Sequence, residues 1–339
     1  MIKRTGKRTL LFQNGVYMRA AAAVAGKKEG EGPLKSWFDK IFEDEYMRED
    51  SFEKAESMLQ KEALQLALKK GHLSHDHLQY CFAGDLLNQC IGSSFGVRDL
   101  GVPFLGLYGA CSTMALSLGI ASVFVEGGAA ETAAAVTSSH FCSSERQFRF
   151  PLEYGSQRTP TAQWTVTAAG AVIVSSHKAP VKVASYTAGE IVDFGVKDAN
   201  NMGAAMAPAA ASTLLHYFED TGQSPSDFDC IFTGDLGAVG TSLLYELLAR
   251  EGVDLSKNHR DCGLMIFERK RQDVHAGGSG CGCIGSVLSG YIFKNLEAGK
   301  LRRVLCCGTG ALLSTVSTGQ GESIPSVAHC VELTREENI

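Results

Sequence analysis

Short apolar segments alternate along the chain with longer segments in which apolar residues recur at helical spacing. Residues 79–83 and 132–138 are apolar and bounded by turn residues, which predicts two buried strands. Helical spacing over 52–70 predicts a helix, with Asp50 and Glu53 placed as a capping box at its start. A second helix is predicted from about residue 86 to 99. This alternation favours an α/β fold.

The stretch from Gly101 to Gly128 is the most apolar part of the chain. It carries no Asp, Glu, Lys or Arg between Leu100 and Val125. Pro103–Tyr108 predicts a buried strand, and residues from Ser112 or Thr113 onward predict a helix that ends at Gly127-Gly128. Glycines, serines and threonines interrupt the run, so we expect two elements enclosed by protein rather than a membrane span.

A repeat divides the chain. FAGDL at 82–86 recurs as FTGDL at 232–236, and flanking leucine and serine positions match at the same offset. We therefore expect a duplicated α/β unit, with an N-terminal half at 1–178 and a C-terminal half at 179–339. The first half includes an N-terminal extension and an irregular segment at 140–161.

Other predicted elements follow the same order in the second half. Small residues at 277–299 predict a helix like the apolar one of the first half, and 304–307 and 323–333 predict strands. Residues 168–175 and 181–188 predict an antiparallel hairpin.

Composition narrows the class of protein. The 339 residues are 45% hydrophobic and 20% charged, with a net charge of −5, which suits a well-buried globular protein and gives no signature of nucleic-acid binding. The 11 cysteines show no disulfide spacing, which indicates a reducing compartment. Polar residues interrupt the N-terminal apolar stretch, so we expect neither a signal peptide nor a transmembrane segment.

Cys111 lies where the apolar strand gives way to the apolar helix. A thiol at a helix N-terminus faces unpaired N–H groups, which favours the thiolate and also favours a bound oxyanion. The alternative is a small buried hydrophobic residue.

Three other sites could converge on Cys111 in a duplicated fold. They are Asp235 after the second strand, His275 in the glycine-rich HAGGSG turn, and Cys306 in LCCGTG. A cysteine beside a histidine would be an activated nucleophile for acyl transfer. Asp235 could instead be an ordinary helix cap, and His275 a surface histidine.

A basic segment follows the strand that ends near His140. Arg146 and Arg149 belong to a group of arginines that could receive carboxylates, although each could simply be a solvated surface charge. Cys281 and Cys283 lack a second ligand pair, so no metal site is predicted, and no phosphate-binding loop or dinucleotide fingerprint indicates a cofactor.

These motifs resemble the thiolase and β-ketoacyl synthase superfamily, a duplicated, five-layered αβαβα fold that usually forms a homodimer. The resemblance is carried by GACST before a small-residue helix, HAGGSG, and the late CxGxG turn. A family of sporulation proteins is more similar still, through the segments AGDLLNQ, TSSHFCSSERQFRFPLEYG, MAPAAA, DCGLMIF and AGGSGC.

The sporulation family implies a protein at the cytoplasmic face of the forespore inner membrane. There it would act peripherally, with integral membrane proteins of its operon, to move dipicolinic acid, with calcium, into the developing spore. A ring such as Phe141 or Tyr154 could stack on the ligand's pyridine ring.

The resemblance also assigns positions. Cys111 falls on the nucleophile, His275 where synthases place a second histidine or an asparagine, and Cys306 on the second cysteine of thiolases. Asp235 stands roughly where several synthases have a histidine. A carboxylate cannot supply an imidazole N–H to an oxyanion, so the condensing machinery is incomplete.

Three hypotheses follow. The favoured one is a binding protein that holds dipicolinate in a degenerate cleft beside Cys111, His140, Arg146, Arg149, Asp235, His275 and Cys306. The second is an acyltransferase that uses Cys111 and His275 on a CoA or carrier-protein thioester. The third is an assembly component with a vestigial cleft.

Overall fold

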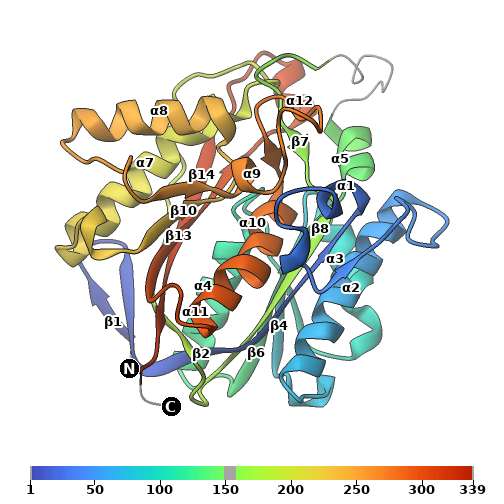
Figure 1. Cartoon of the computed structure of the whole chain (residues 1–339), viewed down its shortest axis with the longest axis vertical. Helices are drawn as coiled ribbons and strands as arrows, with labels where there is room; N and C mark the ends of the chain where they lie inside the picture. The colour runs from blue at the N-terminus through green and yellow to red at the C-terminus, as the bar shows by residue number, and fades with distance from the viewer. Residues whose placement is uncertain (1, 149–157, 338–339) are drawn as a thin grey trace.

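The computed structural model describes residues 2–148 and 158–337. In these residues, twelve strands join one twisted sheet in the order β11-β10-β13-β14-β9-β2-β8-β6-β4-β5, with β1 and β3 paired to β2 (Figure 1). The N-terminal strands are β1 (Ile2–Thr5), β2 (Thr9–Ala25), β3 (Lys40–Ile41), β4 (Tyr80–Gly84), β5 (Phe104–Gly106), β6 (Thr132–Ser139) and β8 (Ala168–Ser175). The C-terminal strands are β9 (Val181–Thr187), β10 (Cys230–Thr233), β11 (His259–Asp261), β13 (Arg303–Ala311) and β14 (Ser326–Arg335).

The sheet consists of two equivalent halves that meet where β2 pairs antiparallel with β9. In one half β4 is parallel to β5 and β6, and β8 is antiparallel to β6 and β2. In the other, β10 is parallel to β11 and β13, and β14 is antiparallel to β13 and β9. The predicted duplication is therefore confirmed, and FAGDL and FTGDL lie at the ends of the equivalent strands β4 and β10.

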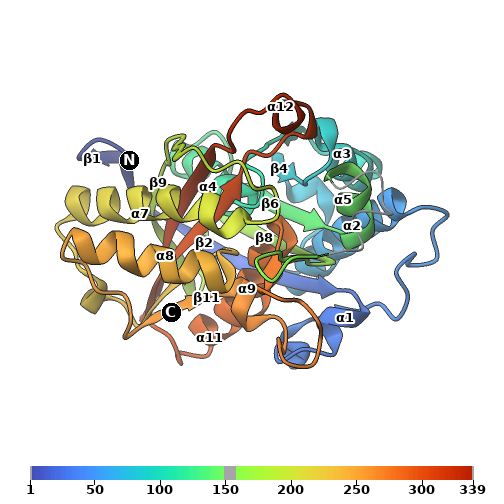
Figure 2. The same ribbon diagram turned by 90° about the horizontal axis from the view of Figure 1, so that it is seen from above.

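Helices form the remaining layers (Figures 1 and 2). Between the two half-sheets lie α4 (Thr113–Glu126) and α10 (Cys281–Val287), which continues through the π-turn η6 (Leu288–Ile292) into α11 (Phe293–Glu297). Helices α2 (Phe52–Lys70) and α3 (Ile91–Val97) cover the outer face of the first half, and α7 (Met202–Thr221) and α8 (Gly237–Arg250) cover the second. This is the five-layered αβαβα arrangement predicted from the sequence.

The remaining short elements surround the ends of the strands. The helical ones are α1 (Lys27–Gly30), η1 (Lys35–Trp37), η2 (His75–His77), η3 (Asn88–Cys90), η4 (Arg98–Leu100), α5 (Phe141–Phe148), η5 (Pro225–Asp227), α9 (Cys262–Met265) and α12 (Thr315–Gly319). A separate two-stranded sheet pairs β7 (Trp164–Thr165) with β12 (Gly278–Ser279).

The helix of the apolar stretch forms as predicted, with α4 beginning at Thr113 and ending before Gly127. The strand before it also forms, but β5 is a short edge strand with Phe104 exposed, so the prediction of a buried strand over Pro103–Tyr108 was wrong. The Gly119 backbone lies so close to Tyr186 that an added Cβ would come within 2.2 Å of its ring, which explains a small residue on this enclosed helix. Such close packing lets one helix contact both half-sheets.

Several local predictions were wrong. β8 and β9 do not form a hairpin, because β2 lies between them. The Ala-rich strand β2 itself was missed, since alanine is a poor signal for a strand. The first helix is capped by Ser51, whose Oγ accepts from the Lys54 N–H, and not by Asp50. The helix predicted over 86–99 is broken into three short pieces, η3, α3 and η4.

Candidate functional site

Cys111 lies in a tight turn between β5 and α4. Ala110, which precedes it, has a φ of +48°, a left-handed conformation that is uncommon for a residue with a Cβ. The turn is fixed by short hydrogen bonds from the Ser112 and Thr113 hydroxyls to the carbonyls of Gly109 and Ala110, both 2.6 Å. A strained residue held this firmly is typical of a functional position.

Asp235 is the charged group beside the thiol. The Cys111 thiol donates a hydrogen bond to the Asp235 carboxylate, and its sulfur lies 3.9 Å from Ser279 Oγ. Asp235 also accepts from Ser279 Oγ at 2.9 Å, from Gly280 N at 2.8 Å and from Thr309 Oγ1 at 2.7 Å. These partners come from β12, the loop before α10, and β13, all in the second half of the chain, whereas Cys111 comes from the first, so both halves build the site.

The electrostatics oppose the thiolate that the sequence predicted. Burial, reinforced by the Asp235 carboxylate, raises the pKa of the Cys111 thiol well above its usual value. Burial also raises the pKa of Asp235, and it raises the pKa of nearby Asp261 to about 7. The thiol is therefore a neutral hydrogen-bond donor in this structure, and the prediction of a favoured thiolate was wrong.

The cavity next to the thiol is small. Its volume is about 30 Å³, room for a water molecule but far below the roughly 300 Å³ at which ligand pockets begin. Its apolar lining includes Leu86, Tyr108, Phe148 and Leu313. Glu145 is the acidic residue among the described lining residues. Among the described lining residues there is no histidine and no basic residue.

His275 contacts Thr159 and Asp273 and not the residues around Cys111. Its Nδ1 is 2.6 Å from the Thr159 carbonyl oxygen, its Nε2 is 3.1 Å from Asp273, and it does not line the Cys111 cavity. The sequence placed His275 next to Cys111 because both fell on catalytic positions of a superfamily. The structure does not bring these two side chains together.

His140 has a structural role, because its ring nitrogens contact the backbone of neighbouring segments. Its ring is buried, with Nε2 2.8 Å from the Glu45 carbonyl oxygen and Nδ1 accepting from the Cys142 N–H at the start of α5. Burial lowers the pKa of His140 to about 4. With both ring nitrogens engaged, it does not line the cavity next to Cys111.

The other predicted residues are also apart from the thiol. Arg146 pairs with Glu53 at 3.0 Å and lines a separate surface hollow. Cys306 is buried on β13 and packs in the central apolar core, whereas Cys307 faces the outer core, as expected for neighbours on a strand. Arg149 and Tyr154 lie outside the described residues.

Two cations lie against Trp164: Arg158, which belongs to the group of arginines that the sequence predicted could receive carboxylates, and Lys28, which the sequence did not single out. Lys28 Nζ is 3.8 Å from the centre of the indole ring and the Arg158 guanidinium carbon is 4.7 Å from it. Phe141 stacks on the same ring at 3.7 Å. Trp164 is adjacent in β7 to Thr165, which lines the Cys111 cavity.

Arg158 retains binding capacity. Its side chain is only 10% exposed, its Nη2 pairs with Asp273 at 2.8 Å, and its buried Nη1 has no hydrogen-bond partner. Burial and the positive charge of Arg158 lower the pKa of Lys28. Because Asp273 also contacts His275, that histidine belongs to this cationic cluster of Lys28, Arg158, Trp164, Asp273 and His275.

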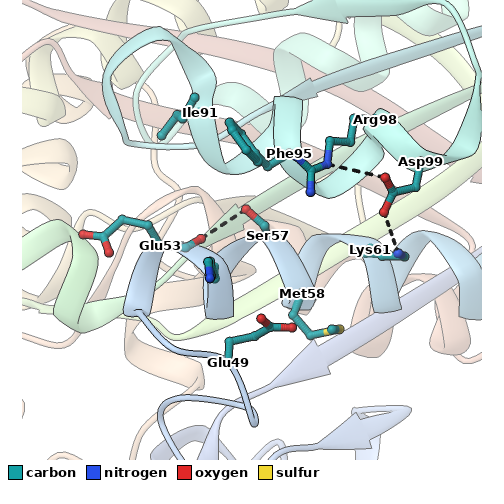
Figure 3. A pocket seen from close by; sticks show the side chains of 10 residues that line it. Glu49, Glu53, Ser57, Met58, Lys61, Ile91, Phe95, Arg98 and Asp99 are labelled. Atoms are coloured by element: carbon teal, nitrogen blue, oxygen red, sulfur yellow. Dashed lines mark hydrogen bonds and ion pairs between the residues drawn. The ribbon is translucent and has the colours of Figure 1, made fainter.

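A much larger hollow lies elsewhere, between α2 and α3 (Figure 3). It has a volume of about 570 Å³, with Met58, Ile91 and Phe95 in its lining. Three of its charged groups pair with one another, because Asp99 accepts from Lys61 at 3.0 Å and contacts Arg98. We do not assign the candidate site to this groove, because these charges already have partners.

Two further properties of the described residues bear on the class of protein. Within 2–148 and 158–337, His, Cys, Asp and Glu side chains form no group of three or more placed to hold a metal ion. No helix in that part of the chain is long and apolar enough to cross a membrane.

The duplicated fold and the cysteine at the start of its buried helix define a thiolase-like protein. Solved structures agree: 3-oxoacyl-[acyl-carrier-protein] synthase III of Aquifex aeolicus VF5 matches with a TM-score of 0.56 and 12% identity, over 94% of this chain and 100% of that one. A variant of OleA from Xanthomonas campestris matches with a TM-score of 0.60 and 14% identity, over 96% and 99%.

Sequence comparison gives the family. The chain belongs to the stage V sporulation protein AD (SpoVAD) family, whose model matches residues 6–334. It is 43% identical over 334 residues to stage V sporulation protein AD of Bacillus subtilis (strain 168), covering 98% of each chain. This is therefore a sporulation protein with a thiolase-like fold.

Proposed function

We propose that the protein binds dipicolinic acid, as the free acid or its calcium chelate, without transforming it. The ligand would bind at the mouth of the degenerate thiolase-like cleft, and the protein would support its uptake into the developing spore. The observation that carries this proposal is the cation pair Lys28 and Arg158 on Trp164, one residue along β7 from the Cys111 cavity.

Dipicolinate is a planar ring with two carboxylates. A guanidinium with an unused N–H can bind one carboxylate in a charge-assisted hydrogen bond, and an ammonium beside it can bind another. Arg158 has such a group in its buried Nη1. The cavity beside Cys111 is small and its nearby charges are acidic, so the carboxylates would be received at the cations and not at the sulfur.

The Cys111 environment argues against an acyltransferase. The thiol donates to a carboxylate, its pKa is raised by burial and by Asp235, and no imidazole lines the cavity in the described residues. An oxyanion formed at this position would face Asp235, which would repel it.

Isothermal titration calorimetry tests the proposal. Dipicolinate should bind saturably with one site per chain, with and without calcium, whereas benzoate, with one carboxylate, should bind more weakly. The absence of a binding signal would refute the proposal. Intact-mass analysis after incubation with acyl-CoAs should show no acyl adduct, and an adduct at Cys111 would favour the enzyme.

We also propose that the protein is a homodimer that works with integral membrane proteins. β5 is the outermost strand of the sheet, and exposed Phe104 and Tyr108 lie on and just after it. An open strand edge with exposed aromatic residues is suited to pairing with another strand. Co-purification of the tagged chain with membrane proteins of its own operon tests the second part, and its failure would contradict it.

A further inference from the structure

Two wall segments close the cavity over Cys111. Leu86, in the loop that follows β4, and Phe148, at the end of α5, form one apolar cluster with Cys111 and Cys281. Their packing leaves the thiol only 4% exposed. Separation of these two walls would expose the sulfur.

Gln147, the neighbour of Phe148, joins the walls. Its Oε1 accepts from the Asn88 backbone N–H at 3.2 Å, and its Nε2 donates to Asn88 Oδ1 at 2.9 Å and to the Leu86 carbonyl at 3.4 Å. One side chain of α5 thus holds the loop after β4 through three hydrogen bonds. We call this set of contacts the Asn88–Gln147 latch.

The loop is strained where the latch holds it. Gln89 and Cys90 have φ values of +59° and +51°, two successive left-handed residues that are not glycine. This conformation is unfavourable for side chains with a Cβ and persists only where the surroundings impose it. Release of the latch would let the loop relax.

A second hollow lies on the outer side of the latch. It has a volume of about 250 Å³ and is lined by Asn88, Gln147, Arg146 and Glu53, among other residues. The Arg146 guanidinium, paired there with Glu53, is half exposed. Three successive residues of α5 therefore face different surroundings. Arg146 lines the outer hollow, Gln147 forms the latch and Phe148 lines the cavity next to Cys111.

We infer that the Asn88–Gln147 latch is a gate between this outer hollow and the Cys111 cavity. Opening of the latch joins the hollow to the cavity and admits a small molecule to the thiol. Dipicolinate held at Lys28 and Arg158, as in the proposed function, need not pass this gate, which is a property of the described contacts alone.

Alkylation of Cys111 by iodoacetamide measures the gate without any ligand. The substitution Gln147→Ala removes the three hydrogen bonds of the latch. Because the two walls then separate more often, alkylation of Cys111 should become faster by about tenfold or more. Gln147→Glu, which can accept from the Asn88 N–H but cannot donate, should give a smaller increase. The matched control Gln320→Ala, at an exposed position far along the chain, should change nothing.

The rates are read peptide by peptide by mass spectrometry. Cys142, partly exposed on α5, should react equally in all variants, which separates gate opening from general unfolding. An unchanged Cys111 rate in Gln147→Ala, or equal acceleration at Cys142 and the buried Cys306, would overturn the inference.

A reversible lock tests the gate. In the double variant Asn88→Cys and Gln147→Cys, oxidation to a disulfide should slow alkylation of Cys111, and reduction should restore the rate. Equal Cys111 alkylation rates in the oxidised and reduced forms would overturn the gate. Dipicolinate binding at Lys28 and Arg158 should be the same in both forms, so a loss of binding in both would contradict the proposed function and leave the gate standing.

Discussion

The Cys111 thiol, which lines a cavity of about 30 Å³, donates a hydrogen bond to the buried Asp235 carboxylate. The carboxylate is held by Ser279, Gly280 and Thr309, so its position does not depend on the thiol. Burial of the thiol, reinforced by the Asp235 carboxylate, raises the pKa of Cys111 and keeps its sulfur protonated.

Asp235→Asn should make Cys111 more acidic. Removing the negative charge takes away one of the causes that raise the pKa of the thiol, so the pH midpoint for Cys111 alkylation should move down. The free energy of unfolding should fall by about 1–3 kcal/mol, because an amide cannot accept from all the donors around it.

Alkylation rates between pH 7 and 10, followed at the Cys111 peptide, measure the midpoint. Asp254→Asn, at an exposed aspartate, is the matched control. An unshifted midpoint in Asp235→Asn would show that Asp235 does not set the reactivity of Cys111.

Arg158→Ala should weaken dipicolinate binding about tenfold to a hundredfold, because a charge-assisted hydrogen bond is lost together with a cation. Arg302→Ala, at a surface arginine that is 76% exposed, should leave the affinity unchanged. Calorimetric titration of both variants provides the measurement. Equal affinities would remove the cationic cluster from the binding site.

Glu29→Gln should flatten the pH dependence of stability. Burial raises the pKa of Glu29 to about 8 from an ordinary value of 4.5, so between these pH values the folded chain keeps a proton that the unfolded chain has lost. Stability therefore falls as pH rises from 4.5 to 8.

The glutamine variant cannot ionise, yet its Oε1 can still accept from the Thr167 N–H. Urea unfolding at pH 5 and pH 8 should show a larger gain for the variant at pH 8. A gain of equal size at both pH values would contradict the raised pKa.

Phe104→Glu should weaken the proposed homodimer by more than about tenfold, because a charge would replace an aromatic side chain at the paired strand edge. Sedimentation velocity over a concentration series measures the change. Val316→Glu replaces another exposed apolar residue, on α12, and should leave the dimer intact. If the unsubstituted protein sediments as a monomer, the proposed homodimer is wrong.

The repeat and the apolar stretch carried most of what the sequence could predict about the fold. FAGDL and FTGDL mark equivalent strand ends. The end of α4 could be predicted from Gly127-Gly128, and the absence of a polar face along the helix predicted that protein encloses it. β2 could not be read in this way. Its alanines lack strand propensity, and only its partners on both sides make it a strand.

The candidate site was less predictable. Asp235 was placed near Cys111 correctly, because strand ends of a duplicated fold meet at the centre. Lys28 and Trp164 come from distant parts of the chain, and nothing local in either segment signals that they touch. His275 shows the converse error, since a glycine-rich turn that is expected near the thiol in a duplicated fold can present its histidine to other residues, here Thr159 and Asp273.

The central position of β2 also governs how the protein can be made. The strand emerges early from the ribosome, yet it pairs with β8 and β9, which end at Ser175 and Thr187. The sheet cannot close until more than half of the chain has been synthesised, and contacts of such long sequence separation slow folding. During that interval the apolar strand β2 lacks the two strands that pair with it. Unpaired apolar strands associate with other chains, so an N-terminal fragment that ends before β8 should aggregate when it is expressed.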